Sequence, residues 1–146
     1  MKILVTGSKG FVGKNFVTAL QNIKDGKDKT RPGIVIDEIY PYDIDSSASE
    51  LDIFCNDADF VFNFAGVNRP KNNEEFMQGN CGFADELIKN LKKHDNKCPV
   101  MLASSLQATL IGRYAEGEYG KSKRAGEQLF FNYANDTGVK ADMLML

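Results

Sequence analysis

Apolar and polar positions alternate along the chain in two distinct rhythms. Short apolar runs, rich in β-branched and aromatic residues, predict five buried strands, at residues 2–6, 33–42, 60–65, 99–105 and 139–146. Apolar positions at helical spacing, or a run that follows helix N-caps, predict helices over about 11–22, 48–56, 73–94 and 119–135. Strands that are apolar on both faces and alternate with helices indicate an α/β domain over residues 1–146. We expect a Rossmann-type, doubly wound parallel sheet with helices on both faces.

A glycine motif follows the first predicted strand directly. Gly7, Gly10 and Gly13 are spaced at three-residue intervals, and the first helix is expected to begin within the motif. Glycine there permits a tight turn, close approach of the backbone to a pyrophosphate, and close packing of the helix on the sheet. The helix N-terminus then offers free N–H groups to the phosphates. Gly13-Lys14 is followed by Asn15, which disfavours a P-loop, and the pattern therefore predicts dinucleotide binding.

A second group of residues indicates proton-transfer chemistry. Tyr119 and Lys123 are four residues apart and share one face of a predicted helix. A fixed positive charge beside a tyrosine makes the phenol more able to exchange a proton with a substrate oxygen. Ser105 ends the fourth strand, at the edge where α/β sheets place ligands, and its hydroxyl can bind the same oxygen. Ser104 is the competing serine, and the register favours Ser105.

These motifs resemble those of the extended short-chain dehydrogenase/reductases, which include sugar-nucleotide epimerases, dehydratases and reductases. Longer strings, such as Ala-Gly-Val-Asn-Arg-Pro and Glu-Tyr-Gly-Lys-Ser-Lys, resemble the N-terminal reductase domain of bifunctional capsular-polysaccharide enzymes that make a precursor of UDP-N-acetyl-L-fucosamine. The resemblance implies NADPH-dependent reduction of the 4-keto group of a UDP-linked N-acetylated deoxyhexose. Tyr119 would donate the proton, Lys123 would hold the nicotinamide ribose, and Ser105 would orient the carbonyl.

Two alternative functions remain open at this point. One is an epimerase or dehydratase of the same family with tightly bound NAD, although Leu106-Gln107 after Ser105 differ from the acidic pair of the dehydratases. The other is a non-catalytic dinucleotide-binding module. The family also has a further substrate-binding segment, and the bifunctional enzymes have a C-terminal cupin domain. We therefore expect residues 1–146 to be the cofactor-binding part of a longer enzyme.

The resemblance also indicates which residues contact the ligands. The expected cofactor-binding residues are Gly7, Ser8, Lys9, Gly10, Phe11, Val12, Gly13, Asp43, Ile44, Ala65, Gly66, Val67 and Lys123. Asn68 and Arg69 are expected to bind the substrate, and Asn80 occupies a position where the family often has asparagine. Asp37, Asp43 and Asp45 compete for the acidic position near the ribose, in a region that is shorter than usual for the family. Lys9 could meet a 2′-phosphate, which favours NADP(H) over NAD(H).

Composition narrows the possible partners and location. The formal net charge is -2 and basic residues form no cluster, which argues against nucleic-acid binding. No apolar run approaches the ~20 residues that span a bilayer. Three widely spaced cysteines and a single histidine argue against a metal site and a disulfide framework, and favour reduced thiols in the cytoplasm. By family analogy, a UDP-sugar is the expected substrate, and a homodimer is expected to form through the helices at 73–94 and 119–135.

Overall fold

The computed structural model describes residues 1–67, 72, 74–110 and 117–146. Five strands form one parallel sheet: β1 (Lys2–Thr6), β2 (Glu38–Tyr42), β3 (Phe60–Asn63), β4 (Val100–Ser104) and β5 (Ala141–Met145). The helical segments are α1 (Phe11–Lys24), α2 (Ala48–Asp57), α3 (Glu74–Phe76), the π-helical η1 (Met77–Gly82), α4 (Phe83–Lys93), the 3-10 turn η2 (Leu106–Thr109) and α5 (Glu118–Thr137). None of the helices in these ranges is long and apolar enough to cross a membrane.

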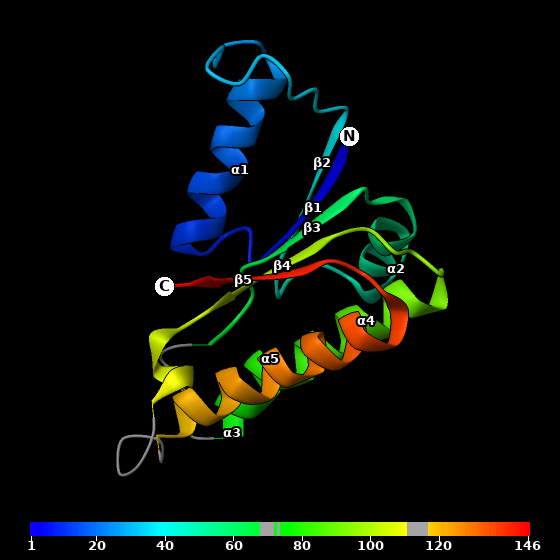
Figure 1. Ribbon diagram of the computed structural model, residues 1–146. Coiled ribbons are helices and arrows are strands. Elements are labelled where there is room, and N and C mark those ends of the chain that lie inside the picture. Colours follow the sequence, from blue (N-terminus) through cyan, green and yellow to red (C-terminus); the bar gives the residue numbers. More distant parts are fainter. Residues whose placement is uncertain (68–71, 73, 111–116) are drawn as a thin grey trace.

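The strand order β2-β1-β3-β4-β5 makes the sheet doubly wound, as the sequence predicts. The chain moves outward from β1 to β2, crosses back through α2 to β3, and then continues outward in the other direction. Figure 1 shows α1 alone on one side of the sheet, with α2, α4 and α5 on the other. Ligands of such sheets bind beyond the carboxyl ends of the strands where the direction of winding changes, here between β1 and β3.

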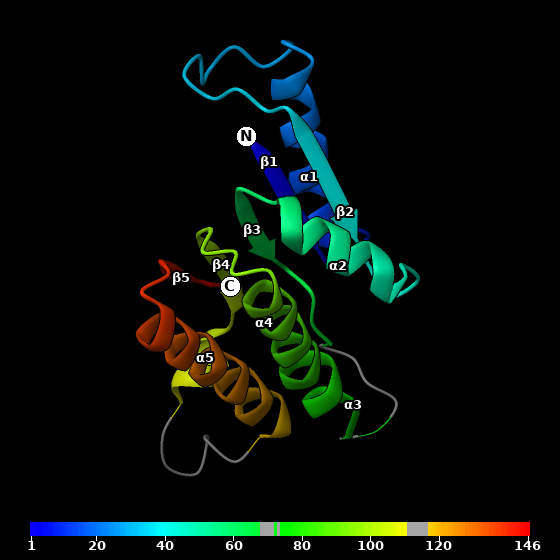
Figure 2. The same ribbon diagram turned by 90° about the vertical axis from the view of Figure 1, so that its right-hand side faces the viewer.

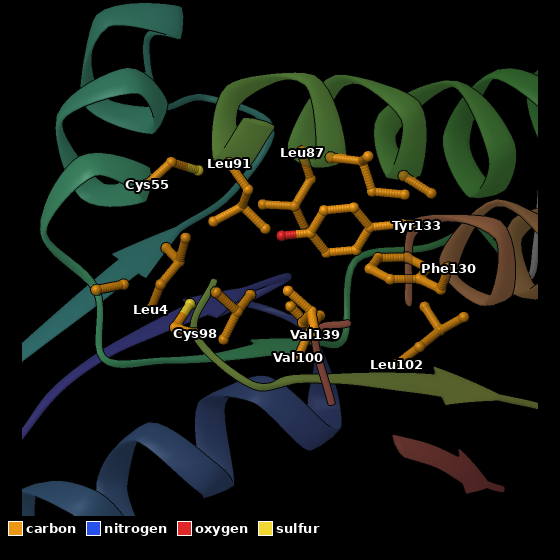
Figure 3. Packing of buried hydrophobic residues seen from close by; sticks show 14 of the residues in the cluster. Leu4, Cys55, Leu87, Leu91, Cys98, Val100, Leu102, Phe130, Tyr133 and Val139 are labelled. Carbon is orange, nitrogen blue, oxygen red and sulfur yellow. The ribbon is translucent and has the colours of Figure 1, made fainter. Parts of the chain in front are cut away.

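Each face of the sheet has its own apolar core. Under α1, Ile3, Val5 and Leu20 are buried and pack with partly buried aromatic side chains such as Phe16 and Phe62. The larger cluster joins the opposite face to α2, α4 and α5, and Figure 3 shows Phe130 and Tyr133 of α5 directed toward leucines of α4 and the sheet. Figure 2 shows α4 and α5 side by side over this face. The packing holds the N-terminal half of α5, where Tyr119 and Lys123 lie, close to the end of β4.

Two predicted elements differ from those observed. The second strand begins at Glu38 rather than 33, because its partner β1 begins at Lys2 and pairs with it in register from there. Pro41 is tolerated in β2 because this strand is at the edge of the sheet. The helix predicted over 73–94 is present from Glu74 to Lys93, but it is not α-helical throughout: the π-helical η1 lies between α3 and α4. π-Helical turns within α-helices are frequent at functional sites.

Candidate functional site

The carboxyl ends of β1 and β3 form the base of the site. Thr6 and Asn63 are fully buried there, and the Thr6 hydroxyl donates a hydrogen bond to the Asn63 side chain, which joins the two strand ends. Gly7 follows with a φ of +66° and lies against the backbone just after β3: a Cβ on Gly7 would stand 2.6 Å from the Ala65 nitrogen. A Cβ on Gly13 would stand 2.1 Å from the Gly7 carbonyl oxygen. The glycine turn therefore has the tight backbone packing that the sequence motif predicts.

Two adjoining cavities lie along this edge of the sheet. The first, of about 490 Å³, extends from the glycine turn to the end of β2, where Tyr42, Asp43 and Ile44 line it, and to Phe83 and Glu86 of α4. The second, of about 440 Å³, extends from the same turn to Tyr119 and Lys123. The two cavities share the lining residues Gly7, Gly10, Phe64, Gly66 and Val67. Together they form one extended trough, with the N-terminus of α1 near its middle.

The N-terminus of α1 is suited to hold the pyrophosphate of a dinucleotide. Its N-cap is Gly10, whose lack of a side chain leaves the first N–H groups without a side-chain acceptor, and the first turn has no acidic residue. These N–H groups and the helix dipole favour an anion. A Cβ on Gly10 would lie 3.3 Å from the Gly7 carbonyl oxygen, a tight contact but a far smaller overlap than the one at Gly13. The residues present therefore fit a bound dinucleotide.

The three aspartates that compete for the position near the ribose lie in different surroundings. Asp37 lies before the strand and pairs with the terminal amine of Met1, at the opposite end of β2 from the trough. Asp43 lines the first cavity, and its carboxylate accepts the backbone N–H of Lys9 at 2.7 Å and that of Ile44 at 2.8 Å. Asp45 forms an ion pair with the Lys9 ammonium. Of the three candidates, Asp43 is therefore the one that lines the trough.

Tyr119 and Lys123 face the second cavity from the start of α5. The Lys123 Nζ lies 5.8 Å from the centre of the Tyr119 ring and donates a hydrogen bond to the Ala103 carbonyl at 3.3 Å. Burial lowers the pKa of Lys123, and the carboxylate of Glu127 opposes that shift. The Tyr119 ring also packs against Phe76, with the two ring centres 5.5 Å apart. The helical spacing thus brings the phenol and the ammonium together beside the glycine turn.

The two candidate serines have different partners. Ser104 lines the second cavity, but its hydroxyl donates a hydrogen bond to the Glu127 carboxylate. Ser105 follows β4, and its hydroxyl oxygen accepts the Gln107 N–H at 3.3 Å as the N-cap of η2. An acceptor role at a cap leaves the Ser105 proton available for a substrate oxygen. The preference for Ser105 stays a prediction.

Asn80 connects the loop after β3 to the helix that carries Tyr119. Its side-chain oxygen accepts the Val67 N–H, and its side-chain nitrogen donates to the Val67 carbonyl and to the Ser122 hydroxyl, each at 3.0 Å. Ser122 in turn donates to the Tyr119 carbonyl at 2.8 Å. Gly126 permits this approach, since a Cβ there would lie 3.2 Å from the Asn80 carbonyl oxygen. The side chain is 6% exposed, so it is a buried polar link rather than a surface residue.

Most of the remaining predicted residues line the trough. Phe11 and Val12 line the second cavity, although they are 87% and 37% exposed. Ile44 lines the first cavity and is 97% exposed. Ala65 and Gly66 also line the first cavity. Asn68 and Arg69 lie outside the described residues. Sequence reasoning did not single out Glu127 or Ser122.

A sequence signal for Asn80 does exist. It lies four residues after Phe76 and three before Phe83, on the apolar stripe of the predicted helix. A polar residue within such a stripe points to a buried hydrogen-bonding role.

Comparison with known proteins also points to a family of nucleotide-dependent enzymes. Residues 3–146 match the model of the NAD dependent epimerase/dehydratase family. The chain is 36% identical over 138 residues to a UDP-2-acetamido-2,6-beta-L-arabino-hexul-4-ose reductase from Pseudomonas aeruginosa, which covers 94% of this chain and 33% of that protein. It is 34% identical to the capsular polysaccharide assembling protein CapF from Staphylococcus aureus, with a TM-score of 0.74 over 98% of this chain and 34% of that one.

A more distant structure has the same fold. The dTDP-glucose 4,6-dehydratase DesIV from Streptomyces venezuelae, solved with NAD bound, matches 99% of this chain and 55% of its own with a TM-score of 0.78 at 17% identity. The chain therefore spans about a third of the length of the two more similar proteins. The match across nearly the whole chain, together with the glycine turn and the doubly wound sheet, shows that this protein belongs to the NAD dependent epimerase/dehydratase family.

Proposed function

We propose that this chain is the cofactor-binding and proton-donating part of a reductase that converts the 4-keto group of a UDP-linked N-acetylated deoxyhexose to an alcohol. The observation that supports this most directly is the convergence of the glycine turn, Tyr119 and Lys123 on one cavity. The 36% identity to a reductase of a UDP-linked 4-ketohexose supports the substrate class. In the two more similar proteins most of the length lies outside the matched region.

A nicotinamide cofactor would supply the hydride. In the proposed reaction, the Tyr119 hydroxyl donates a proton to the oxygen of the ketone as its carbon is reduced. Lys123, on the same face of α5, binds the ribose next to the nicotinamide and stabilises the phenolate that Tyr119 leaves behind. Ser105 donates a hydrogen bond to the ketone oxygen and orients it toward Tyr119. The backbone around Gly10 and Val12 holds the pyrophosphate.

We further propose NADPH as the preferred hydride donor. Lys9 lies beside the turn after β2, where Asp43 lines the end of the trough that suits the adenosine ribose. An ammonium at this position would pair with a 2′-phosphate. The family analogy also leads us to propose a homodimer formed through the outer faces of α4 and α5, in the cytoplasm. Light scattering on the purified protein would test the dimer directly.

The test of the function is the Tyr119→Phe variant. We expect turnover of a UDP-linked 4-keto-6-deoxyhexosamine with NADPH, measured by loss of reduced-nicotinamide absorbance, to fall about 10²- to 10⁴-fold. The dissociation constant for NADPH should be unchanged, because the phenylalanine retains the ring contact with Phe76. Tyr40→Phe is the matched control, since Tyr40 lies on β2 and donates to Asp57. Undiminished turnover in Tyr119→Phe would remove Tyr119 from its role as proton donor.

A further inference from the structure

The glycine turn and the turn after β2 are joined by three contacts. The Ser8 N–H donates to the Tyr42 carbonyl at 3.2 Å, and the Lys9 N–H donates to the Asp43 carboxylate at 2.7 Å. The third contact is the ion pair between the Lys9 ammonium and the Asp45 carboxylate. The first two fix the backbone of Lys9 beside the adenosine end of the trough. The third determines where its charge is directed.

The charges around this end of the trough are predominantly negative. Asp43 and Glu86 line the first cavity, and both side chains are carboxylates. Lys123 lines the second cavity, at the other end of the trough. Among the described residues, Lys9 is the cation that contacts the turn after β2. Its ammonium can therefore balance negative charge that a ligand adds there. A 2′-phosphate brings close to two negative charges to this region, whereas a 2′-hydroxyl brings none.

We propose that Asp45 is a specificity-determining residue, which competes with the 2′-phosphate of NADPH for the Lys9 ammonium. This inference rests on the proposed function and deepens it by assigning the strength of the NADPH preference to one ion pair. NADPH binds only when Lys9 leaves Asp45, whereas NADH binds with the ion pair intact. Asp45 therefore weakens NADPH binding and leaves NADH binding unaffected.

The expected effect is modest because both side chains are exposed, Lys9 by 67% and Asp45 by 59%. The hydrogen bond between them raises the pKa of Lys9 and lowers that of Asp45, so both groups are charged at neutral pH. An exposed ion pair is weak. Removing Asp45 as a competitor for the Lys9 ammonium should therefore change the affinity for NADPH by only about two- to fivefold. The fold should be unaffected by its removal.

The experiment is a titration of wild type and Asp45→Asn with NADPH and, separately, NADH. We expect Asp45→Asn to bind NADPH about two- to fivefold more tightly and NADH with unchanged affinity. Asp142→Asn is the matched control, because Asp142, on β5, forms a similarly exposed ion pair with Lys140. An NADPH affinity that is the same in Asp45→Asn as in the wild type would overturn the inference and leave the proposed function standing. Failure of the wild type to bind either nucleotide would overturn both.

A double-mutant cycle tests whether Asp45 acts through Lys9. Lys9→Met should weaken NADPH binding and leave NADH binding unchanged. In the Lys9→Met background, the further Asp45→Asn change should no longer alter the ratio of the two affinities. If the ratio still shifts by the same factor without Lys9, Asp45 repels the phosphate directly, and competition for the ammonium is refuted.

Discussion

Replacing Asn80 with alanine should destabilise the fold and loosen the cofactor site together. The change removes three hydrogen bonds, two to the Val67 backbone and one to Ser122. Each such bond contributes about 1 kcal/mol net, and buried groups left without a partner add to the loss. We therefore expect the free energy of unfolding to fall by about 2–4 kcal/mol. For a domain of this size, that is a large part of the total stability.

The assay is equilibrium unfolding in urea, with the slope of the transition checked against the wild type to exclude a change in the unfolded state. Asn90→Ala provides the control: Asn90 is on α4, is part of the same helical region, and donates a single exposed hydrogen bond to the Glu86 carbonyl. Its replacement should change stability by less than about 0.5 kcal/mol. If both variants lose the same amount, the Asn80 network contributes nothing beyond an ordinary surface asparagine.

The same variant should also weaken nicotinamide-cofactor binding under conditions in which it remains folded. The Asn80 side chain holds the backbone of Val67, which lines both cavities. A Cβ on Gly66 would lie 2.6 Å from the Asn80 side-chain oxygen, so this loop is closely packed against the asparagine. Without that contact, the loop samples more conformations and binding must order it again. Wild-type affinity in folded Asn80→Ala would refute the positioning role and leave only a contribution to stability.

Three further predictions concern the glycine turn and the cysteines. Gly13→Ala should prevent stable folding, because its Cβ would lie 2.1 Å from the Gly7 carbonyl oxygen. Gly10→Ala should lower the melting temperature much less, because the same contact is 3.3 Å there, and should weaken cofactor binding; equal melting temperatures for the two variants would contradict the steric argument. Burial raises the pKa of Cys55 to about 12 and that of Cys98 to about 11, so a thiol reagent at neutral pH should modify Cys81 first and the other two only on unfolding. The raised pKa values also predict that stability, fully retained at neutral pH, falls as the pH rises from about 9 toward 11, because only the unfolded thiols ionise readily there.

Local patterns were sufficient for much of the fold. Apolar runs and helical spacing depend on neighbours within a few residues, and they predicted all five strands and the parallel arrangement that the structure has. The bounds were less accurate where pairing decides them: β2 begins at Glu38 because β1 offers no partner earlier. The glycine motif was predicted equally well, because the close contacts of Gly10 and Gly13 are with residues of the turn itself.

The sequence by itself determined the doubly wound fold, the position of the glycine turn, and the shared face of Tyr119 and Lys123. Only the tertiary structure decided which of the three candidate aspartates lines the trough, that Ser104 is bound to Glu127, and that Asn80 is buried. The physical reason is that these properties depend on partners far away in the chain: Asn80 binds Val67 and Ser122, 13 and 42 residues distant. No local pattern specifies which distant groups a polar side chain will meet once the helices pack on the sheet.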